Sequence, residues 1–359
     1  MKRRNFLTQA STGLAATILA APAISQSVTP IKWRLASSFP KSLDTIYGAG
    51  AFFCERVGKL TDGKFEITPY AAGQIVPALQ VLDAVQQGTV ECGHTASYYY
   101  VGKNRAFAFG CAIPFGLTSR QQSAWEYAGG GQELLRDFYK EYGIIHFPAG
   151  NTGTQMGGWF KKEIKTVADL KGLKMRIPGI GGEVMGRLGA APQALPGGEI
   201  YAALERGVID AAEWIGPYDD EKLGLNKIAK HYYYPAFWEG GTQICVMINA
   251  AAWDKLPKHF QEAVESAAAE AHVKMQAQYD AKNPIALKSL LASGVKLNPF
   301  PRDVLRAANK ASFELYDAEA AKNPAFKKLY EPWKKFREQQ YEWFNLAELS
   351  FESFSFPGK

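Results

Sequence analysis

The chain has 359 residues, a length that allows two or three structural units. Hydrophobic residues make up 47% and charged residues 21%, which excludes a disordered chain. The net charge of +6 is small, and with no run of Lys or Arg it predicts neither a nucleic-acid surface nor a basic membrane patch. No run of 18 apolar residues occurs, so we expect no permanent membrane-spanning helix.

Residues 1–25 have the pattern of a cleavable export signal. Basic residues open the segment, a short apolar stretch follows, and Ala21 and Ala23 fit the small-x-small rule of signal cleavage. The paired Arg3 and Arg4 resemble a twin-arginine signal, and an ordinary secretory signal is the alternative. Either signal predicts that the mature protein works in the periplasm.

After this leader, the chain alternates between expected strands and helices. In the first part, strands are predicted at 31–36, 65–70, 90–94 and 143–147, and helices at 43–60, 77–87 and 123–142, the last interrupted by glycines. In the second part, β segments are predicted at 157–160, 171–178, 191–194, 211–214 and 242–249, with helices at 182–188 and 198–207. From residue 257 onward the prediction is mostly helical, at 258–291 with a kink at Pro284, 302–323 and 325–347. This order predicts an α/β protein with two lobes, a ligand cleft between the lobes and a long C-terminal helical extension.

The four cysteines, Cys54, Cys92, Cys111 and Cys245, are far apart in the sequence and mostly have apolar neighbours. A chain of this size does not need disulfides for stability, so we expect four buried thiols. The five histidines are scattered, and no spacing typical of a zinc site occurs.

Three charged residues and one tryptophan are the main candidates for a binding site. Arg176 ends a short expected strand, where an arginine can bind a carboxylate with two parallel hydrogen bonds. Glu213 and Trp214 end another strand, and Glu239 lies between aromatic residues and glycines. The two glutamates are oxygen ligands suited to sodium or calcium, and the same pair is also compatible with glycoside hydrolysis.

Two further segments add weaker candidates. Asn151, Thr152 and Gln155 follow an expected strand, and their amide and hydroxyl groups can bind a carboxylate or a cation. The segment from Thr95 to Tyr100 follows a buried strand, and alternate tyrosines there can line a pocket. The signatures of a nucleophile elbow, a Walker A loop and a dinucleotide-binding loop are all absent.

Two of these segments carry a family resemblance. The run Asp-Leu-Lys-Gly-Leu-Lys-Met-Arg-Ile-Pro at 169–178 and the run Gly-Val-Ile-Asp-Ala-Ala-Glu at 207–213 are similar to the solute-binding subunits of tripartite ATP-independent periplasmic (TRAP) transporters. The resemblance extends from residue 31 to the C-terminus, and the export signal at residues 1–25 is also typical of this family. The Glu213-Trp214 pair and the aromatic C-terminal helix resemble the branch that binds 2-oxo acids such as pyruvate.

The resemblance implies a two-lobe periplasmic solute-binding fold. Lobe I would comprise residues 28–153 and 242–281, lobe II residues 154–241 and 282–322, and the C-terminal helix, residues 323–359, would form a homodimer by exchange between subunits.

The resemblance also implies a role for each site residue. Arg176 would pair with the ligand carboxylate. The remaining roles fall to two sets: Gln155, Glu213, the Trp214 carbonyl and Glu239 as ligands of a sodium ion, and Thr95, Tyr98, Tyr100, Asn151 and Thr152 around the pocket.

These implications predict a binding protein with no catalytic activity. It would capture short 2-oxo monocarboxylates, such as pyruvate or 2-oxobutyrate, and pass them to the membrane permease subunits. Two alternatives stay open from the sequence: a calcium-dependent binder of lactate or another hydroxy acid, and a periplasmic glycoside hydrolase that uses Glu213 and Glu239.

Overall fold

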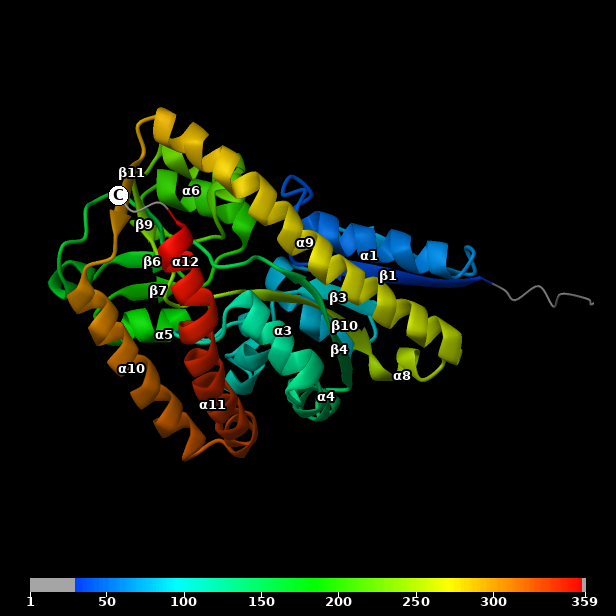
Figure 1. The fold of residues 1–359 in the computed structure, drawn as a ribbon. Helices are drawn as coiled ribbons and strands as arrows, with labels where there is room; N and C mark the ends of the chain where they lie inside the picture. Colours follow the sequence, from blue (N-terminus) through cyan, green and yellow to red (C-terminus); the bar gives the residue numbers. More distant parts are fainter. Residues whose placement is uncertain (1–29, 357–359) are drawn as a thin grey trace, which may run out of the picture.

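The computed structural model describes residues 30–356 and contains two β-sheets (Figure 1). The first sheet has the strand order β2-β1-β3-β10-β4, and the second has the order β11-β9-β5-β8-β6-β7. The strands are β1 (Ile31–Ser37), β2 (Phe65–Tyr70), β3 (Cys92–Thr95), β4 (Ile144–Asn151), β5 (Gly158–Phe160), β6 (Lys174–Arg176), β7 (Ala191–Gln193), β8 (Ala211–Ala212), β9 (His231–Tyr234), β10 (Gln243–Asn249) and β11 (Lys296–Pro299). Strands β1, β2 and β3 run parallel, and β10 joins them antiparallel to β3 and β4.

Helices cover both sheets and fill the C-terminal third of the chain. Their bounds are α1 (Ile46–Leu60), α2 (Val81–Gln86), α3 (Ser119–Ala128), α4 (Gly131–Lys140), α5 (Gly179–Arg187), α6 (Ile200–Glu205), α7 (Pro217–Lys222), α8 (Ala250–Trp253), α9 (Lys258–Ala292), α10 (Arg302–Ala320), α11 (Pro324–Phe344) and α12 (Ser350–Ser355). The predicted α/β class with a helical C-terminal extension is therefore confirmed. None of the helices in residues 30–356 is long and apolar enough to cross a membrane.

The long helix α9 connects the two parts of the molecule. It packs against α1 and β4 of the first sheet and against α7 beside the second sheet, and Figure 1 shows it, in yellow, running along both. Its buried face toward the first sheet is rich in alanine (Ala263, Ala267, Ala268 and Ala271), whose small side chains allow close packing. The helix continues through Pro284 to Ala292 without interruption.

One local prediction is confirmed and one addition is needed. The glycine interruption expected in the helix at 123–142 divides it into α3 and α4, where Gly130 adopts a left-handed φ of 81°. A side chain at Gly131 would overlap the ring of Trp125, at 2.5 Å, so this position requires glycine. The sequence analysis did not predict β9 or β11, which pair with each other in parallel at the edge of the second sheet.

The aromatic residues of the C-terminal extension divide into two groups. Phe326, Tyr330 and Trp333 on α11 are buried in the chain's own core, where Phe326 and Trp333 pack against Phe109. Beyond α11 the large apolar side chains face solvent, and Phe354 is 92% exposed. The first half of the aromatic tail is therefore packed within its own chain, and dimerisation through residues 323–359 stays a prediction.

All four cysteines are buried and free, as expected. A buried carboxyl, that of Glu126, lies near one of them, Cys245, inside the first lobe. Glu126 on α3 accepts hydrogen bonds from the side-chain amides of Gln122, at 3.0 Å, and Gln243. Burial raises the pKa of Glu126 to about 8, and the two amides only partly oppose this effect.

We expect Glu126 to make the protein less stable as the pH rises from about 4.5 to about 8. Over this range the native carboxyl keeps its proton while the unfolded chain releases it, so this group lowers the free energy of unfolding by up to about 1.4 kcal/mol per pH unit. Chemical denaturation of Glu126→Gln at pH 5, 6, 7 and 8 should show a shallower decline than wild type. Substitution of the exposed Glu262 by Gln is the control, and an equal pH dependence in wild type and Glu126→Gln would contradict the prediction.

A candidate ligand and cation site between the two sheets

Parallel pairing in the second sheet brings Arg176 and Glu213 together. Arg176, the last residue of β6, is in register with Ala212 of β8, so Glu213 follows beside it. The backbone N–H of Glu213 donates to the carbonyl of Arg176 at 3.1 Å. Both side chains are almost fully buried, with exposed fractions of 1% and 0%. Arg176 is therefore not the exposed surface arginine that the sequence alone also allowed.

The guanidinium of Arg176 is held on three sides. Its Nε donates to the carbonyl of Leu195 at 3.0 Å, and its Nη1 donates to the Glu213 carbonyl at 3.0 Å and to the Glu213 carboxylate. The Trp214 ring lies against it, 5.0 Å from Cζ to the ring centroid. The remaining nitrogen, Nη2, is buried and has no partner among the described residues. The Nη2 group of this rigid, planar guanidinium is thus left to donate to a ligand.

The two segments that cross between the sheets carry the other candidates. Residues 152–157 connect β4 to β5, and residues 235–242 connect β9 to β10. They are bonded to each other: the Gln155 N–H donates to the Glu239 carbonyl at 3.2 Å, and the Ala236 N–H donates to the Gln155 carbonyl at 3.2 Å. Gln155 and Glu239, far apart in the sequence, therefore lie side by side at the crossing.

Three buried oxygens at this crossing have no hydrogen-bond partner among residues 30–356. They are Oε1 of Gln155, Oε2 of Glu213 and Oε2 of Glu239. The amide of Gln155 is fixed in orientation, because its Nε2 donates to the hydroxyls of Thr152 at 3.2 Å and Thr242 at 3.0 Å. Buried polar atoms are rarely left without partners, so three such oxygens together indicate a bound group that accepts their lone pairs.

The charges of this cluster also favour a cation. Burial raises the pKa of Glu239 to about 7, against the opposing effects of Thr242, Arg176 and Tyr98. Burial likewise raises the pKa of Glu213, the guanidinium of Arg176 lowers it, and the charge of Glu239 raises it further. Two buried carboxyls thus share one arginine. The donor set fits a hard cation such as sodium or calcium, which binds carboxylate and amide oxygens.

No group of three or more His, Cys, Asp or Glu side chains in residues 30–356 is arranged to hold a metal ion. The candidate set does not contradict this, because it contains only two such side chains, and its other members are an amide and a backbone carbonyl.

A small cavity with about 220 Å³ of empty space lies next to these residues. Its lining is mainly aromatic, aliphatic and hydroxyl side chains: Phe39, Ile46, Ala96, Tyr98, Tyr99, Thr152, Gln155, Trp214, Ile215, Thr242 and Ile244. Such walls exclude water from a ligand and limit the size of its side chain.

The structure places the weaker candidates unequally. Thr152 and Tyr98 line the cavity, but Thr95 and Tyr100 do not, and the Thr95 and Tyr100 hydroxyls are bonded to each other at 2.8 Å. The segment Ser97–Tyr100 is a 3₁₀ helix, so the alternation expected of a strand does not apply, and Tyr99 joins Tyr98 at the cavity. Asn151 uses its Oδ1 to accept from the Gly153 N–H at 2.9 Å, which shapes the turn before Gln155.

The sequence analysis missed Tyr99, Phe39 and Thr242 as cavity residues. It also missed Asp219, whose carboxylate accepts hydrogen bonds from the Trp214 indole at 3.4 Å and from the Tyr279 hydroxyl at 2.7 Å. No pattern in the sequence identifies these residues, because the contacts join segments that are far apart or lie on different lobes.

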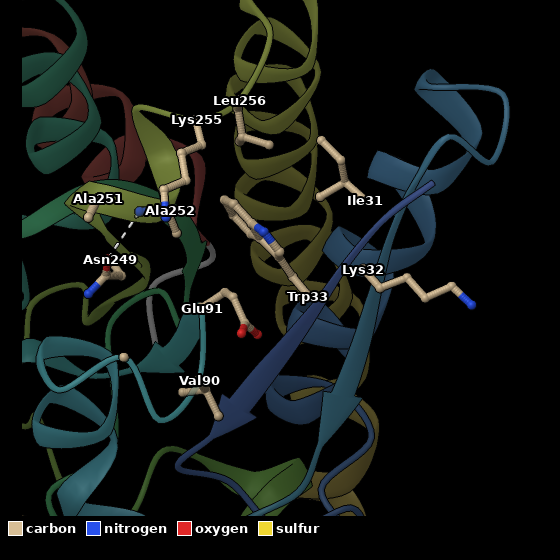
Figure 2. A pocket seen from close by; sticks show the side chains of 11 residues that line it. Ile31, Lys32, Trp33, Val90, Glu91, Asn249, Ala251, Ala252, Lys255 and Leu256 are labelled. Carbon is tan, nitrogen blue, oxygen red and sulfur yellow. Dashed lines mark hydrogen bonds between the residues drawn. The ribbon is translucent and has the colours of Figure 1, made fainter. Parts of the chain in front are cut away.

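A separate depression lies on the first lobe, at the start of β1 (Figure 2). It is lined by Trp33, Lys32, Glu91 and Lys255, among others, and Glu91 is already paired with Arg34 at 3.1 Å. Among the described residues, every buried polar side-chain atom that lines this depression has a hydrogen-bond partner, so none is left for a ligand. The crossing between the sheets, and not this depression, is therefore the candidate ligand site.

Comparison with known proteins identifies the class. The model of the bacterial extracellular solute-binding proteins, family 7, matches residues 36–323, and the chain belongs to this family. A monocarboxylate 2-oxoacid-binding periplasmic protein of Nostoc sp. is 54% identical over 361 residues, which cover 99% of each chain.

Two solved structures are similar to this chain over most of its length. A TRAP transporter solute-binding protein from Bordetella bronchiseptica has a TM-score of 0.90 at 52% identity, over 91% of this chain and 97% of the other. It was obtained as a dimer of mixed occupancy, with calcium and picolinate in one site. A TRAP periplasmic solute-binding protein from Pseudoalteromonas atlantica, with sodium and pyruvate bound, has a TM-score of 0.88 at 41% identity, over 91% of this chain and 100% of the other.

These findings confirm the predicted family, the fold and the prediction of a solute-binding receptor in place of an enzyme. The alternative of a glycoside hydrolase is wrong, because the family consists of binding proteins. The family is also extracytoplasmic, as expected. The twin-arginine signal lies outside the described residues and stays a prediction, as do the individual roles of the site residues.

Proposed function

We propose that this protein captures short 2-oxo monocarboxylates, such as pyruvate or 2-oxobutyrate, for the membrane permease subunits of a TRAP transporter. The observation that carries this proposal is a set of four buried atoms between the sheets that have no hydrogen-bond partner within residues 30–356: Nη2 of Arg176, Oε1 of Gln155, Oε2 of Glu213 and Oε2 of Glu239. The cationic nitrogen of Arg176 can donate to a ligand carboxylate, and the three oxygens can bind a metal ion. The names of the relatives in Nostoc and Pseudoalteromonas support this choice of ligand.

In this proposal the chain's own residues orient the ligand. Glu213 and Leu195 fix the plane of the Arg176 guanidinium, and Trp214 covers one face of it, so that Nη2 is held toward the ligand carboxylate. Glu239, Glu213, Gln155 and the Trp214 carbonyl would hold a sodium ion. When bound, this ion would offer a positive charge to the adjacent carboxylate and keto oxygens of a 2-oxo acid.

The walls of the cavity would select for size and exclude water. Phe39, Tyr98 and Ile244 come from the first sheet's side, and Trp214 and Ile215 from the second, so closure of the two parts would surround the ligand. The cavity is small and closely lined, so only a short side chain would fit beside the cation ligands. Removal of water would strengthen each electrostatic contact to the carboxylate.

Calcium is the second candidate for the metal, because the relative from Bordetella carries calcium with picolinate, which is also a carboxylate. With both site carboxylates ionised, these two groups, the ligand carboxylate and Arg176 together carry a net charge of about −2, which calcium would balance and sodium would halve. The choice between sodium and calcium therefore needs a direct measurement.

We expect Arg176→Lys to weaken pyruvate binding by at least about tenfold and Arg176→Ala to abolish it. Lysine keeps the charge but cannot keep both bonds to Glu213 while reaching the ligand, and alanine leaves Glu213 buried without its partner. Isothermal titration of each folded variant measures the effect. Arg187→Ala, on α5, is the control and should bind like wild type. Wild-type affinity in folded Arg176→Ala would refute the carboxylate assignment.

We expect pyruvate to raise the melting temperature only when the cation is present. A ligand at one hundred times its Kd should add about 2.7 kcal/mol to the free energy of unfolding. The protein, freed of metal with a chelator, is screened with pyruvate, 2-oxobutyrate and lactate in sodium, calcium and potassium buffers. Stabilisation by pyruvate in sodium supports the proposal. Stabilisation by lactate in calcium alone would contradict the sodium and 2-oxo assignments.

We propose, in addition, that the exposed end of the C-terminal helix forms a homodimer. Leu346, Phe351 and Phe354 are 71%, 69% and 92% exposed, which is unusual for one continuous surface of a soluble chain. The dimer of the relative from Bordetella supports this arrangement.

Truncation after Phe344 should convert the dimer to a folded monomer, because the buried residues of α11 remain in place. Truncation after Asn323 also removes Phe326, Leu329, Tyr330 and Trp333 from the core, and it should destabilise the protein by several kcal/mol, as about 3–5 kcal/mol is typical for one such aromatic. Sedimentation and thermal unfolding separate the two effects. An unchanged sedimentation coefficient after truncation at Phe344 would refute dimerisation through this end.

A further inference from the structure

The segment that carries Glu239 is packed directly against another loop of the first lobe. The Phe115 N–H donates to the Phe237 carbonyl at 2.7 Å, and the two rings are stacked with their centroids 5.2 Å apart. Further along, a Cβ at Gly241 would lie 2.2 Å from the backbone nitrogen of Ser119, so the two backbones are in contact there. The position of residues 237–241 therefore depends on the position of residues 115–119.

The loop at 115–119 is in turn held by the C-terminal helix α11. Arg337 donates from Nε to the Phe115 carbonyl at 2.7 Å, and the Tyr341 hydroxyl lies 2.7 Å from the Gly116 carbonyl and 3.0 Å from that of Phe115. Phe115 has a φ of 53°, a conformation that a residue with a large side chain rarely adopts. The surrounding structure must hold Phe115 in this conformation. Arg337 and Tyr341 contribute to this, because both donate hydrogen bonds to the Phe115 carbonyl.

A contact between the crossing segments extends this connection to a second site residue. Thr154 donates to the Gly240 carbonyl at 2.8 Å, and the Gln155 N–H donates to the Glu239 carbonyl. Gln155 and Glu239 are thus fixed to the same supported segment. Arg176 and Glu213, by contrast, are positioned by the pairing of β6 with β8 in the second sheet.

We infer that Arg337 and Tyr341 of α11 are positioning residues for the cation half of the ligand site, acting through Phe115 on Glu239 and Gln155. This inference rests on the proposed function, because that function includes Glu239 and Gln155 among the four ligands of the cation, with Glu213 and the Trp214 carbonyl. It gives the C-terminal helix a role inside its own subunit, in addition to the proposed dimer contact at its exposed end. Its specific consequence is that loss of these hydrogen bonds weakens the cation before it weakens the recognition of the carboxylate.

The test compares three variants of the full-length mature protein. Tyr341→Phe removes one hydroxyl, and the double variant Arg337→Met with Tyr341→Phe removes all the α11 hydrogen bonds to the loop. Glu348→Gln is the matched control: it breaks the ion pair between Arg120 and Glu348, at 2.5 Å, which also ties the C-terminal extension to the first lobe but does not involve Phe115. Sedimentation and thermal unfolding of each ligand-free variant establish that it is folded and in which oligomeric state.

The first readout is the sodium concentration that gives half-maximal pyruvate binding. It is measured by titration calorimetry in potassium buffer, and a parallel titration uses calcium in place of sodium. We expect this concentration to rise about five- to tenfold in the double variant, less in Tyr341→Phe, and not at all in Glu348→Gln. The affinity for pyruvate at saturating sodium should change less than twofold. An unchanged cation midpoint in the double variant, or an equal shift in Glu348→Gln, would overturn the inference.

The second readout, hydrogen exchange of residues 236–242 in ligand-free protein, does not depend on ligand identity. Faster exchange in the double variant, with wild-type exchange in Glu348→Gln, supports positioning through Phe115 even if wild type binds no pyruvate. In that case the proposed function fails, and the structural connection stands by itself. Unchanged exchange in the double variant would overturn the connection, whether or not pyruvate binds.

Discussion

The buried ion pair between Arg176 and Glu213 is the interaction on which the ligand site depends. An arginine and a glutamate that are both hidden from water cost a large desolvation free energy, which only complete and well-aligned hydrogen bonding offsets. The protein meets this condition in part, because the Leu195 and Glu213 carbonyls also accept from the guanidinium. Within residues 30–356, Nη2 of Arg176 and Oε2 of Glu213 have no partner, and these two atoms define what a ligand must supply.

The two sheets place this pair where a ligand can be enclosed. The segments that cross between them add Gln155 and Glu239, while α9 contacts elements of both lobes along its length. At the rim, Asp44, which precedes α1, accepts a hydrogen bond from Tyr218 of α7 at 3.0 Å and pairs with Lys222 of the same helix. Exposed pairs of this kind contribute little singly.

The C-terminal extension combines two physical roles along one continuous helical segment. Its first half supplies Phe326 and Trp333 to the core, and its middle supports the loop at 115–119 through Arg337 and Tyr341. Only its last part has the exposed apolar surface expected of a contact with a second copy. The inferred path from Arg337 and Tyr341 to the ligand site is short, and it consists of hydrogen bonds and one pair of stacked rings.

The sequence by itself determined the α/β class, the helical C-terminal third, the family and the residue types that the site needs. These features depend on local periodicity, on the chemistry of single residues and on two contiguous motifs, all of which are readable along the chain. The tertiary structure alone decided which of those residues meet. The register of β6 against β8 buries Arg176 beside Glu213, and a 3₁₀ turn brings Tyr99, and not Tyr100, to the cavity. It also decided that Trp333 belongs to the core while Phe354 faces solvent, because burial depends on contacts between segments that are hundreds of residues apart in the sequence and leave no local pattern in it.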